Sequence, residues 1–389
     1  MGLLKVNMTI VIFIVISSIY CHAQTVERND YERSSMHIMM IKHLNQRYDD
    51  IIEEVFLKYP FPARFNNHDL GVKVVSFAEL EGDQSSNIMS FASEVNLGQK
   101  MVAKWFNREK KTGAFDMSLV KERGFYNSNQ NERNEARASL RGLSLVEDAG
   151  ENLIHNTFLL VNDISYKSKG SGNWLLKAVG SAYIGSANKM SKAMTSIGGF
   201  RVHITSYLFR LAWNERISKE FYTKYYVESG SIDTNKVSAF KEEKSLFRME
   251  YVGKTQSESA ETHFTASKDP SALLVKVTSR AIDKNIALLQ HQYADFRIKA
   301  PLISTNPLKA DVGLKEDIRE NTQFEVLERV TDENGKISYE TVGVIRPVKG
   351  KIKDNRYLAE EDTDAILDAT EFEVVSGKGF VPGMLIREK

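Results

Sequence analysis

The sequence has very little cysteine: its one cysteine, Cys21, lies near the N-terminus, in a segment with the pattern of an export signal. In that segment Lys5 supplies a positive charge and residues 10–16 form an apolar run. Cys21 and Ala23 then occupy the small-residue positions of a cleavage site. We therefore predict a signal peptide over residues 1–23, cleaved after Ala23. The mature chain would contain no cysteine, which excludes disulfides, thiol catalysis and thiolate metal ligands.

Two other interpretations of this segment are weaker. The apolar run is shorter than the roughly 20 residues that a membrane-spanning helix needs. A lipoprotein signal would acylate Cys21, but the bulky Tyr20 precedes that cysteine where such signals have a small residue. The segment resembles the export signals of envelope proteins in Gram-negative bacteria. The expected location is the periplasm or the outer membrane, with the medium as the alternative.

The sequence also lacks an excess of charge of either sign. It has 52 Lys and Arg against 51 Asp and Glu, and the predicted signal peptide contains one basic and no acidic residue. The mature chain would thus carry 51 of each kind. Because proteins that bind nucleic acid normally show a basic face, nucleic acid is not expected as a partner.

Motifs that identify a reaction are absent as well. The sequence has no zinc-hydrolase His-Glu-x-x-His, no Gly-x-Ser-x-Gly elbow and no glycine-rich phosphate loop. The best constellation is Glu147, Glu151 and His155, which are spaced four apart and would stack along one side of a helix. These three could bind a cation or act as an acid/base pair. Charged helix surfaces often produce such triplets, so a solvated helix face is favoured, and no cofactor or metal site is predicted.

What the sequence does contain is apolar patterning typical of a folded α+β domain over residues 24–298. Helices are expected at about 41–55, 88–95, 131–155 and 270–296, and strands at 72–77, 158–164, 200–214 and 246–252. Residues 158–164 are almost all apolar, so that strand should be covered on both faces. The alternation breaks near Ser206, which suggests a bulge, and the polar residues 255–268 should form a loop. These elements predict N-terminal helices packed on a mainly antiparallel sheet.

The remaining residues, 299–389, predict a small all-β domain of the SH3-like or small-barrel kind. Residues 323–330 and 337–345 flank an Asn-Gly pair, which favours a tight turn and hence a β-hairpin. Further short strands are expected at 371–375 and 383–386.

Between the two central strands lies an excursion, residues 170–199, that contains no acidic residue. Its bulky apolar residues could contact a membrane surface or a partner, and the candidates are Trp174, Leu175, Leu176, Tyr183 and Ile184. The favoured interpretation is a pair of short crossover helices that cover the sheet.

Two aromatic segments have two interpretations each. Trp105 and Phe106 adjoin several cations and could stack on bases or sugars, but a buried helix end is favoured. The cluster at Phe221, Tyr222, Tyr225 and Tyr226 could form a sugar platform or part of the core, and the spacing does not decide between them.

Together these observations predict an exported cell-envelope protein with a binding or assembly role, which is not expected to be an enzyme. An envelope protein or surface partner would be its partner, and the sequence predicts no oligomeric state. The alternative function is that of a carboxylate-dependent hydrolase or cation-binding protein based on Glu147, Glu151 and His155.

Overall fold

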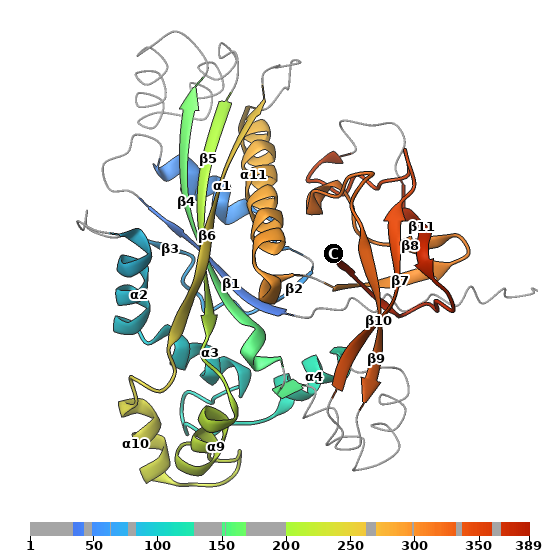
Figure 1. The fold of residues 1–389 in the computed structure, drawn as a ribbon. Coiled ribbons are helices and arrows are strands. Elements are labelled where there is room, and N and C mark those ends of the chain that lie inside the picture. The colour runs from blue at the N-terminus through green and yellow to red at the C-terminus, as the bar shows by residue number, and fades with distance from the viewer. Residues whose placement is uncertain are drawn as a thin grey trace, which may run out of the picture.

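The computed structural model describes residues 34–42, 49–62, 64–76, 83–127, 150–151, 153–168, 200–261, 270–297, 299–331, 337–359 and 367–389. The predicted signal peptide, most of the predicted helix 131–155 and the whole excursion 170–199 lie outside the described residues. The chain forms a sheet with helices on both faces and a barrel beside it (Figure 1). We call the described residues from 34 to 297 the sheet domain and those from 299 to 388 the barrel.

The sheet combines parallel and antiparallel pairing. Its strand order is β2 (Phe65–Asn67), β1 (Ser34–Ile41), β4 (Thr157–Ser168), β5 (Phe200–Leu211) and β6 (Met249–Glu261), and β3 (Val74–Val75) also pairs with β1. β1 is parallel to β2, β3 and β4, whereas the longer pairings of β4 with β5 and of β5 with β6 are antiparallel. The predicted α+β class is therefore confirmed.

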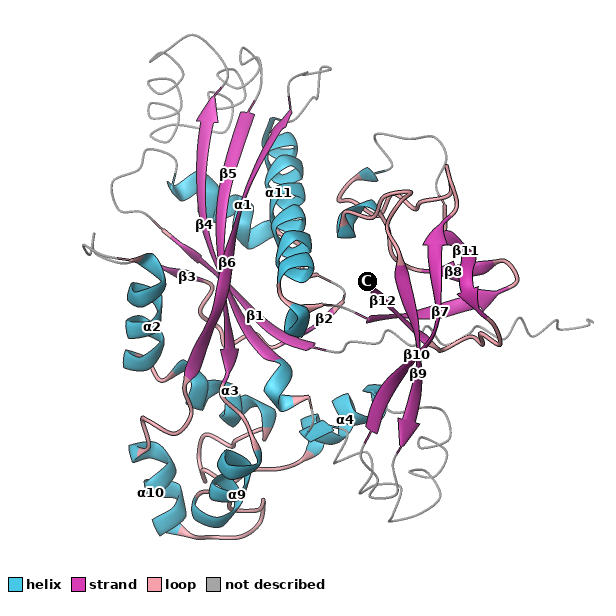
Figure 2. Cartoon of the chain, viewed as in Figure 1, coloured by secondary structure: helices cyan, strands magenta, loops and turns pink. Residues whose placement is uncertain are grey.

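Helices cover both faces of the sheet (Figure 2). One face packs against α1 (Asp49–Lys58) and α11 (Pro270–Gln292). The other face packs against α2 (Gln84–Glu94), α3 (Leu97–Trp105), α4 (Ser118–Asn127), α9 (Glu215–Lys224) and α10 (Thr234–Glu242). β1 and β4 are consequently apolar on both sides, as strands buried between two layers must be.

Two predictions for the sheet domain were wrong. Residue 41 ends the strand β1 instead of opening a helix, and the part of the predicted helix that is described as helical belongs to α1. All eight residues of β1 are buried, so apolar side chains occupy consecutive positions and conceal the alternation that marks a half-buried strand. Residues 255–261 continue β6 instead of forming a loop. β6 is the last strand of the described sheet, and its exposed positions Lys254, Gln256 and Glu258 gave it a loop-like composition.

The other elements of this domain agree with the sequence. The predicted strands 158–164 and 200–214 correspond to β4 and β5, and Pro270 opens the long helix α11 that packs on the sheet. The predicted irregularity exists, but it lies between Leu208 and Phe209, two residues beyond Ser206.

The barrel is closed and antiparallel. Its strands are β7 (Lys299–Thr305), β8 (Leu308–Ala310), β9 (Phe324–Thr331), β10 (Ile337–Pro347), β11 (Thr370–Gly377) and β12 (Leu385–Glu388), in the order β10-β11-β8-β7-β12-β9. The predicted hairpin is β9 with β10, and the small-barrel prediction is confirmed, although β7 and β8 were not expected.

Helix α11 lies between the sheet and the barrel (Figure 2). Arg280 Nε donates to the carbonyl of Tyr357 at 3.0 Å, and His291 Nδ1 lies 2.8 Å from Glu388 Oε2 on β12. α11 therefore serves both as the cover of the sheet and as the surface on which the barrel rests. Within the described ranges, no helix has both the length and the apolar character needed to cross a membrane.

Candidate functional site

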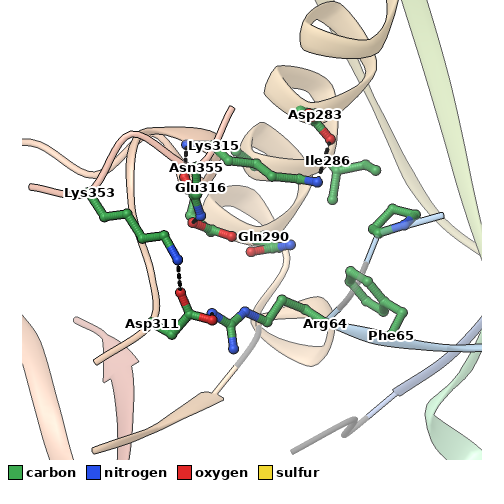
Figure 3. A pocket seen from close by; sticks show the side chains of 12 residues that line it. Arg64, Phe65, Asp283, Ile286, Gln290, Asp311, Lys315, Glu316, Lys353 and Asn355 are labelled. Carbon is green, nitrogen blue, oxygen red and sulfur yellow. Dashed lines mark hydrogen bonds and ion pairs between the residues drawn. The ribbon is translucent and has the colours of Figure 1, made fainter. Parts of the chain in front are cut away.

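A cavity of about 180 Å³ lies where α11 meets the barrel (Figure 3). We call it the junction cavity. Its lining comes from three parts of the chain: Pro62, Arg64 and Phe65 around the start of β2, Asp283, Ile286, Ala287 and Gln290 on α11, and Asp311, Lys315, Glu316, Lys353 and Asn355 in the barrel.

The periodicity of α11 explains how this helix serves two neighbours. Ile282 and Leu289 are fully buried against the sheet. Asp283, Ala287 and Gln290 are four and three residues apart, so they share another side of the helix, which lines the cavity. A single helix thus presents an apolar stripe to the sheet and a mixed stripe to the barrel.

On the barrel side, the short 3₁₀ helix η3 (Leu314–Glu316) supplies Lys315 and Glu316. Gly313 precedes η3, and a side chain at this position would collide with the carbonyl of Lys353. The Gly313 N–H donates to Glu316 Oε2 at 2.7 Å, and Asn355 Nδ2 donates to the same oxygen at 2.8 Å. The Glu316 carboxylate is therefore held in one orientation by the barrel itself.

Ion pairs cross the junction. Arg64 Nη2 lies 3.3 Å from Asp311 Oδ2, and Lys315 Nζ lies 3.2 Å from Asp283 Oδ1. A third pair, Lys353 Nζ with Asp311 Oδ1 at 2.6 Å, lies within the barrel. Three cations and three carboxylates therefore line the cavity, and their formal charges balance.

Asp283 is the most deeply buried of these carboxylates, with a side chain that is 4% exposed. Burial raises the pKa of Asp283, and the nearby Lys315 ammonium opposes that shift. The hydroxyl of Tyr59 donates to Asp283 at 2.9 Å, and burial also raises the pKa of this tyrosine. Asp283 therefore connects α11 with η3 and with Tyr59, the residue that follows α1.

Some polar groups of the cavity have hydrogen-bonding capacity that no described residue satisfies. Gln290 is 9% exposed, yet its side-chain amide has no hydrogen-bond partner among the described residues, and it points into the cavity (Figure 3). Glu316 Oε1 accepts no hydrogen bond from the described part of the chain, and the one polar contact of Arg64 there is that with Asp311. These groups can bind a small polar molecule by hydrogen bonds and ion pairs.

The residues predicted from the sequence lie elsewhere. Glu147 is outside the described residues, and so are the five excursion candidates, Trp174, Leu175, Leu176, Tyr183 and Ile184. Glu151 lies at the end of a helical segment, where its Oε1 accepts a 2.6 Å hydrogen bond from the Tyr222 hydroxyl. His155 lies on the 3₁₀ helix η1 (Ile154–Asn156) and is exposed. The described residues include no group of three His, Cys, Asp or Glu side chains that could hold a metal ion.

Both aromatic segments belong to the core. Trp105 and Phe106 have no exposed surface, which confirms the buried helix end. Phe221 is fully buried with its ring centroid 4.5 Å from that of Phe106, and Tyr225 is 5% exposed. The cluster at residues 221–226 therefore fills the interior between α3, α9 and the sheet instead of forming a platform at the surface.

The junction cavity was not found from the sequence. Its lining comes from segments separated by more than 200 residues, and its charged residues have neither a motif nor a common spacing. The one local feature in the sequence was the pair of polar residues Asp283 and Gln290, which lie on one side of a helix whose other residues are typical of a helix packed on a sheet.

Comparison with known proteins adds no family to this picture. No protein-family model matches the chain, and no curated protein matches it significantly in sequence. A function for the chain therefore has to be argued from its own residues.

Proposed function

We propose that this chain is an exported binding protein of the cell envelope that takes up a small polar ligand in the junction cavity. One observation carries the proposal: the side-chain amide of Gln290, a residue that is only 9% exposed, points without a described partner into a cavity lined by charges from both domains. The polar atoms of this amide are not among the fully buried side-chain atoms that lack a partner, so they are accessible from the cavity and can bond to a ligand there.

The shape and place of the cavity support binding. Ligand sites occur preferentially between domains, where they combine apolar walls with a few convergent polar groups. Here Phe65, Ile286 and Ala287 supply the apolar part. The volume of about 180 Å³ suits a small molecule and not a polymer.

Binding at this place would also link the two domains. A ligand that contacts α11 and η3 together adds interactions across the junction, beside the Lys315 to Asp283 ion pair. Occupancy would then stabilise one arrangement of the barrel on the sheet domain, and an envelope protein or surface partner could recognise that arrangement.

The first experiment measures thermal unfolding of the purified mature protein with common amino acids, short dicarboxylates, short diamines and monosaccharides. It uses wild type and Ala287→Met, in which a longer side chain fills the cavity from α11. The matched control is Ala294→Met, which places the same side chain at an exposed position. We expect at least one compound to raise the midpoint for wild type and Ala294→Met but not for Ala287→Met. If none of these compounds raises it, the binding proposal fails.

Export is tested separately by fractionation of cells and mass spectrometry of the recovered protein. The proposal requires a mature N-terminus at Gln24 and recovery outside the cytoplasm. Full-length protein found only in the cytoplasm would contradict it. A variant without residues 171–197 tests the proposed membrane contact, because it should leave the membrane fraction if Trp174 and its neighbours anchor the chain.

A second candidate function is retained because of the 2.6 Å hydrogen bond between Tyr222 and Glu151. This bond orients the carboxylate of Glu151. Together with Glu147 and His155, Glu151 forms the predicted set of residues that could bind a cation or act as acid and base. Calorimetric titration with calcium, magnesium and zinc, on wild type and on Glu151→Gln, tests the set. Binding that Glu151→Gln weakens would support this candidate, and equal titrations of the two proteins would remove it.

A further inference from the structure

We propose that the ligand of the junction cavity is an amino-acid-like zwitterion, with its carboxylate at Arg64, its ammonium at Glu316 and hydrogen bonds to the Gln290 amide. This inference rests on the proposed binding function and names the ligand class. The ligand class follows from the cavity's hydrogen-bond donors and acceptors that have no partner among the described residues.

Arg64 is the open cation. Its side chain is 17% exposed, and its ion pair with Asp311 at 3.3 Å involves one nitrogen, Nη2. Lys353 lies closer to the same carboxylate, at 2.6 Å, so Asp311 is already neutralised without Arg64. A guanidinium has five N–H donors in a planar fork that matches a carboxylate, which leaves Arg64 able to take a second one.

Glu316 is the open anion. Its Oε2 receives the hydrogen bonds from Gly313 and Asn355, which orient the carboxylate, while Oε1 accepts none from a described residue. Asp283 and Asp311 by contrast have lysine ammonium groups at 3.2 and 2.6 Å. An ammonium group on the ligand would therefore find its best acceptor at Glu316 Oε1.

Gln290 lines the same cavity, and its amide is drawn beside Glu316 and above Arg64 (Figure 3). Its amide offers both donors and an acceptor, and it can therefore bond to the carboxylate and the ammonium of one small molecule. Ile286 and Phe65 line the same cavity and can contact an aliphatic side chain. The cavity thus provides for each part of an aliphatic amino acid.

Other ligand classes fit less well. A dicarboxylate would place its second negative charge near Glu316, and a diamine would place its second positive charge near Arg64. A zwitterion adds no net charge to a lining whose three cations and three carboxylates already balance. The volume of about 180 Å³ accommodates a ligand of roughly the size of one amino acid.

The test uses three probes of nearly equal shape: L-valine, 3-methylbutanoate, which lacks the ammonium group, and 2-methylpropylamine, which lacks the carboxylate. Each is titrated calorimetrically into the mature full chain. We expect L-valine to bind at least about tenfold more tightly than either analogue, because each loses one charge-assisted contact. An analogue that binds as tightly as L-valine would overturn the assignment.

Two variants test whether L-valine binds in the junction cavity. Gln290→Leu removes the open amide, and Arg64→Met removes the open guanidinium. Each should weaken L-valine binding at least about tenfold, whereas Gln292→Leu, an exposed position two residues further along α11, should not change it. Unchanged binding by both cavity variants would overturn the site. Arg64→Met should in addition leave the affinity for 2-methylpropylamine unchanged, which a merely unfolded variant could not do.

The outcomes for the two proposals differ. If a sugar, dicarboxylate or diamine stabilises wild type but not Ala287→Met, and no amino acid does, the binding function stands and the zwitterion assignment is wrong. If no compound stabilises wild type, both are wrong.

Discussion

Two polar clusters of this protein each contain an arginine beside a buried surface. The two arginines differ in how fully their surroundings use their hydrogen-bonding capacity. In the sheet domain, Arg123 is 6% exposed, donates to Ser35 Oγ at 2.7 Å and lies 3.0 Å from His68 Nδ1. Its guanidinium also stacks over Trp105 at 4.3 Å from the ring centroid. We call these residues, with the neighbouring His37, the Arg123 cluster.

In the junction cavity, Arg64 shares its one carboxylate with a lysine, and the amide of Gln290 beside it has no partner among the described residues. In the Arg123 cluster, the polar groups of Arg123, Ser35 and His68 bond to one another, and only His37 Nε2 is buried without a described partner. The cavity groups Gln290, Glu316 and Arg64 are instead accessible from the cavity, where a small molecule can reach them. Satisfied buried networks stabilise one conformation, and open ones are where ligands bind. The comparison distinguishes a structural cluster from the proposed binding site.

The chemistry of His68 supports the structural role. An arginine can only donate, so the nitrogen that faces Arg123 is an acceptor, and the other, Nε2, can donate to the Met101 carbonyl at 3.0 Å. Burial lowers the pKa of His68 well below its usual value, with Arg123 as the next cause. His68 is therefore held in one neutral tautomer.

The largest expected effect is the acid sensitivity of the Arg123 cluster. Burial lowers the pKa of His37 to about 4, and that of His68 is lowered as well. Between pH 6.5, near the pKa of an unfolded histidine, and about pH 4, the unfolded chain binds protons that the folded chain does not. The free energy of unfolding therefore falls as pH falls. In this range each histidine lowers the free energy of unfolding by about 1.4 kcal/mol per pH unit. His37 alone lowers it by about 3 kcal/mol by pH 4.

Urea unfolding at a series of pH values from 7 to 4.5 measures this slope. A variant His37→Asn should show a shallower slope than wild type by about one proton, even if it is less stable throughout. A free energy of unfolding that does not change between pH 6.5 and 5 would show that neither histidine is held neutral.

The next effect compares the two arginines directly. Arg123→Met leaves the buried Ser35 hydroxyl and His68 Nδ1 without their donor, and we expect a loss of about 3 kcal/mol in the free energy of unfolding. Arg64→Met removes a partly solvated ion pair whose carboxylate retains Lys353, and we expect a loss below about 1 kcal/mol. Chemical denaturation of both variants at pH 7 measures the difference. Equal losses would contradict the distinction between the clusters.

Sequence patterning predicted the layers of this protein better than its sites. The buried runs of β4 and β5, the Pro270 start of α11 and the β9–β10 hairpin follow from periodicity and turn residues, which are local properties. β1 was not predicted, and its last residue, Ile41, was assigned to a helix, because its eight buried residues have no alternation to show. β6 was cut short because its exposed positions resemble those of a loop.

The junction cavity could not be predicted in the same way, because it depends on which side of α11 receives the barrel. Asp283 and Gln290 mark a polar stripe, but a polar stripe on a helix normally faces water. Only the placement of η3 against α11 brings Glu316 to Gln290. Contacts between Arg64 and Asp311, 247 residues apart in sequence, have no local signal.

A smaller effect tests whether the cavity is built for binding and not for stability. Gln290→Leu replaces an amide without a described partner by an apolar side chain of similar size. We expect the free energy of unfolding of the ligand-free protein to stay within about 1 kcal/mol of the wild-type value, because the amide is accessible from the cavity and loses no hydrogen bond to the described chain. Thermal and chemical denaturation of this variant and of Gln292→Leu measure it. A clear loss of stability in Gln290→Leu alone would mean that the amide has a structural partner.

The smallest effect is that of His291, which lies at the same junction and responds to pH in the opposite direction from the Arg123 cluster. The hydrogen bond with Glu388 at 2.8 Å raises the pKa of His291, so the folded chain holds this proton more tightly than the unfolded chain does. The resulting stability is fully present below about pH 6.5 and is lost as pH rises through the folded pKa. For a partly exposed pair the contribution is below about 1 kcal/mol. His291→Gln should therefore be less stable than wild type at pH 6 and equal to it at pH 9, as measured by urea unfolding. A difference that is the same at both pH values would assign the contact to packing instead of charge, and the junction would then show no opposite response to acid.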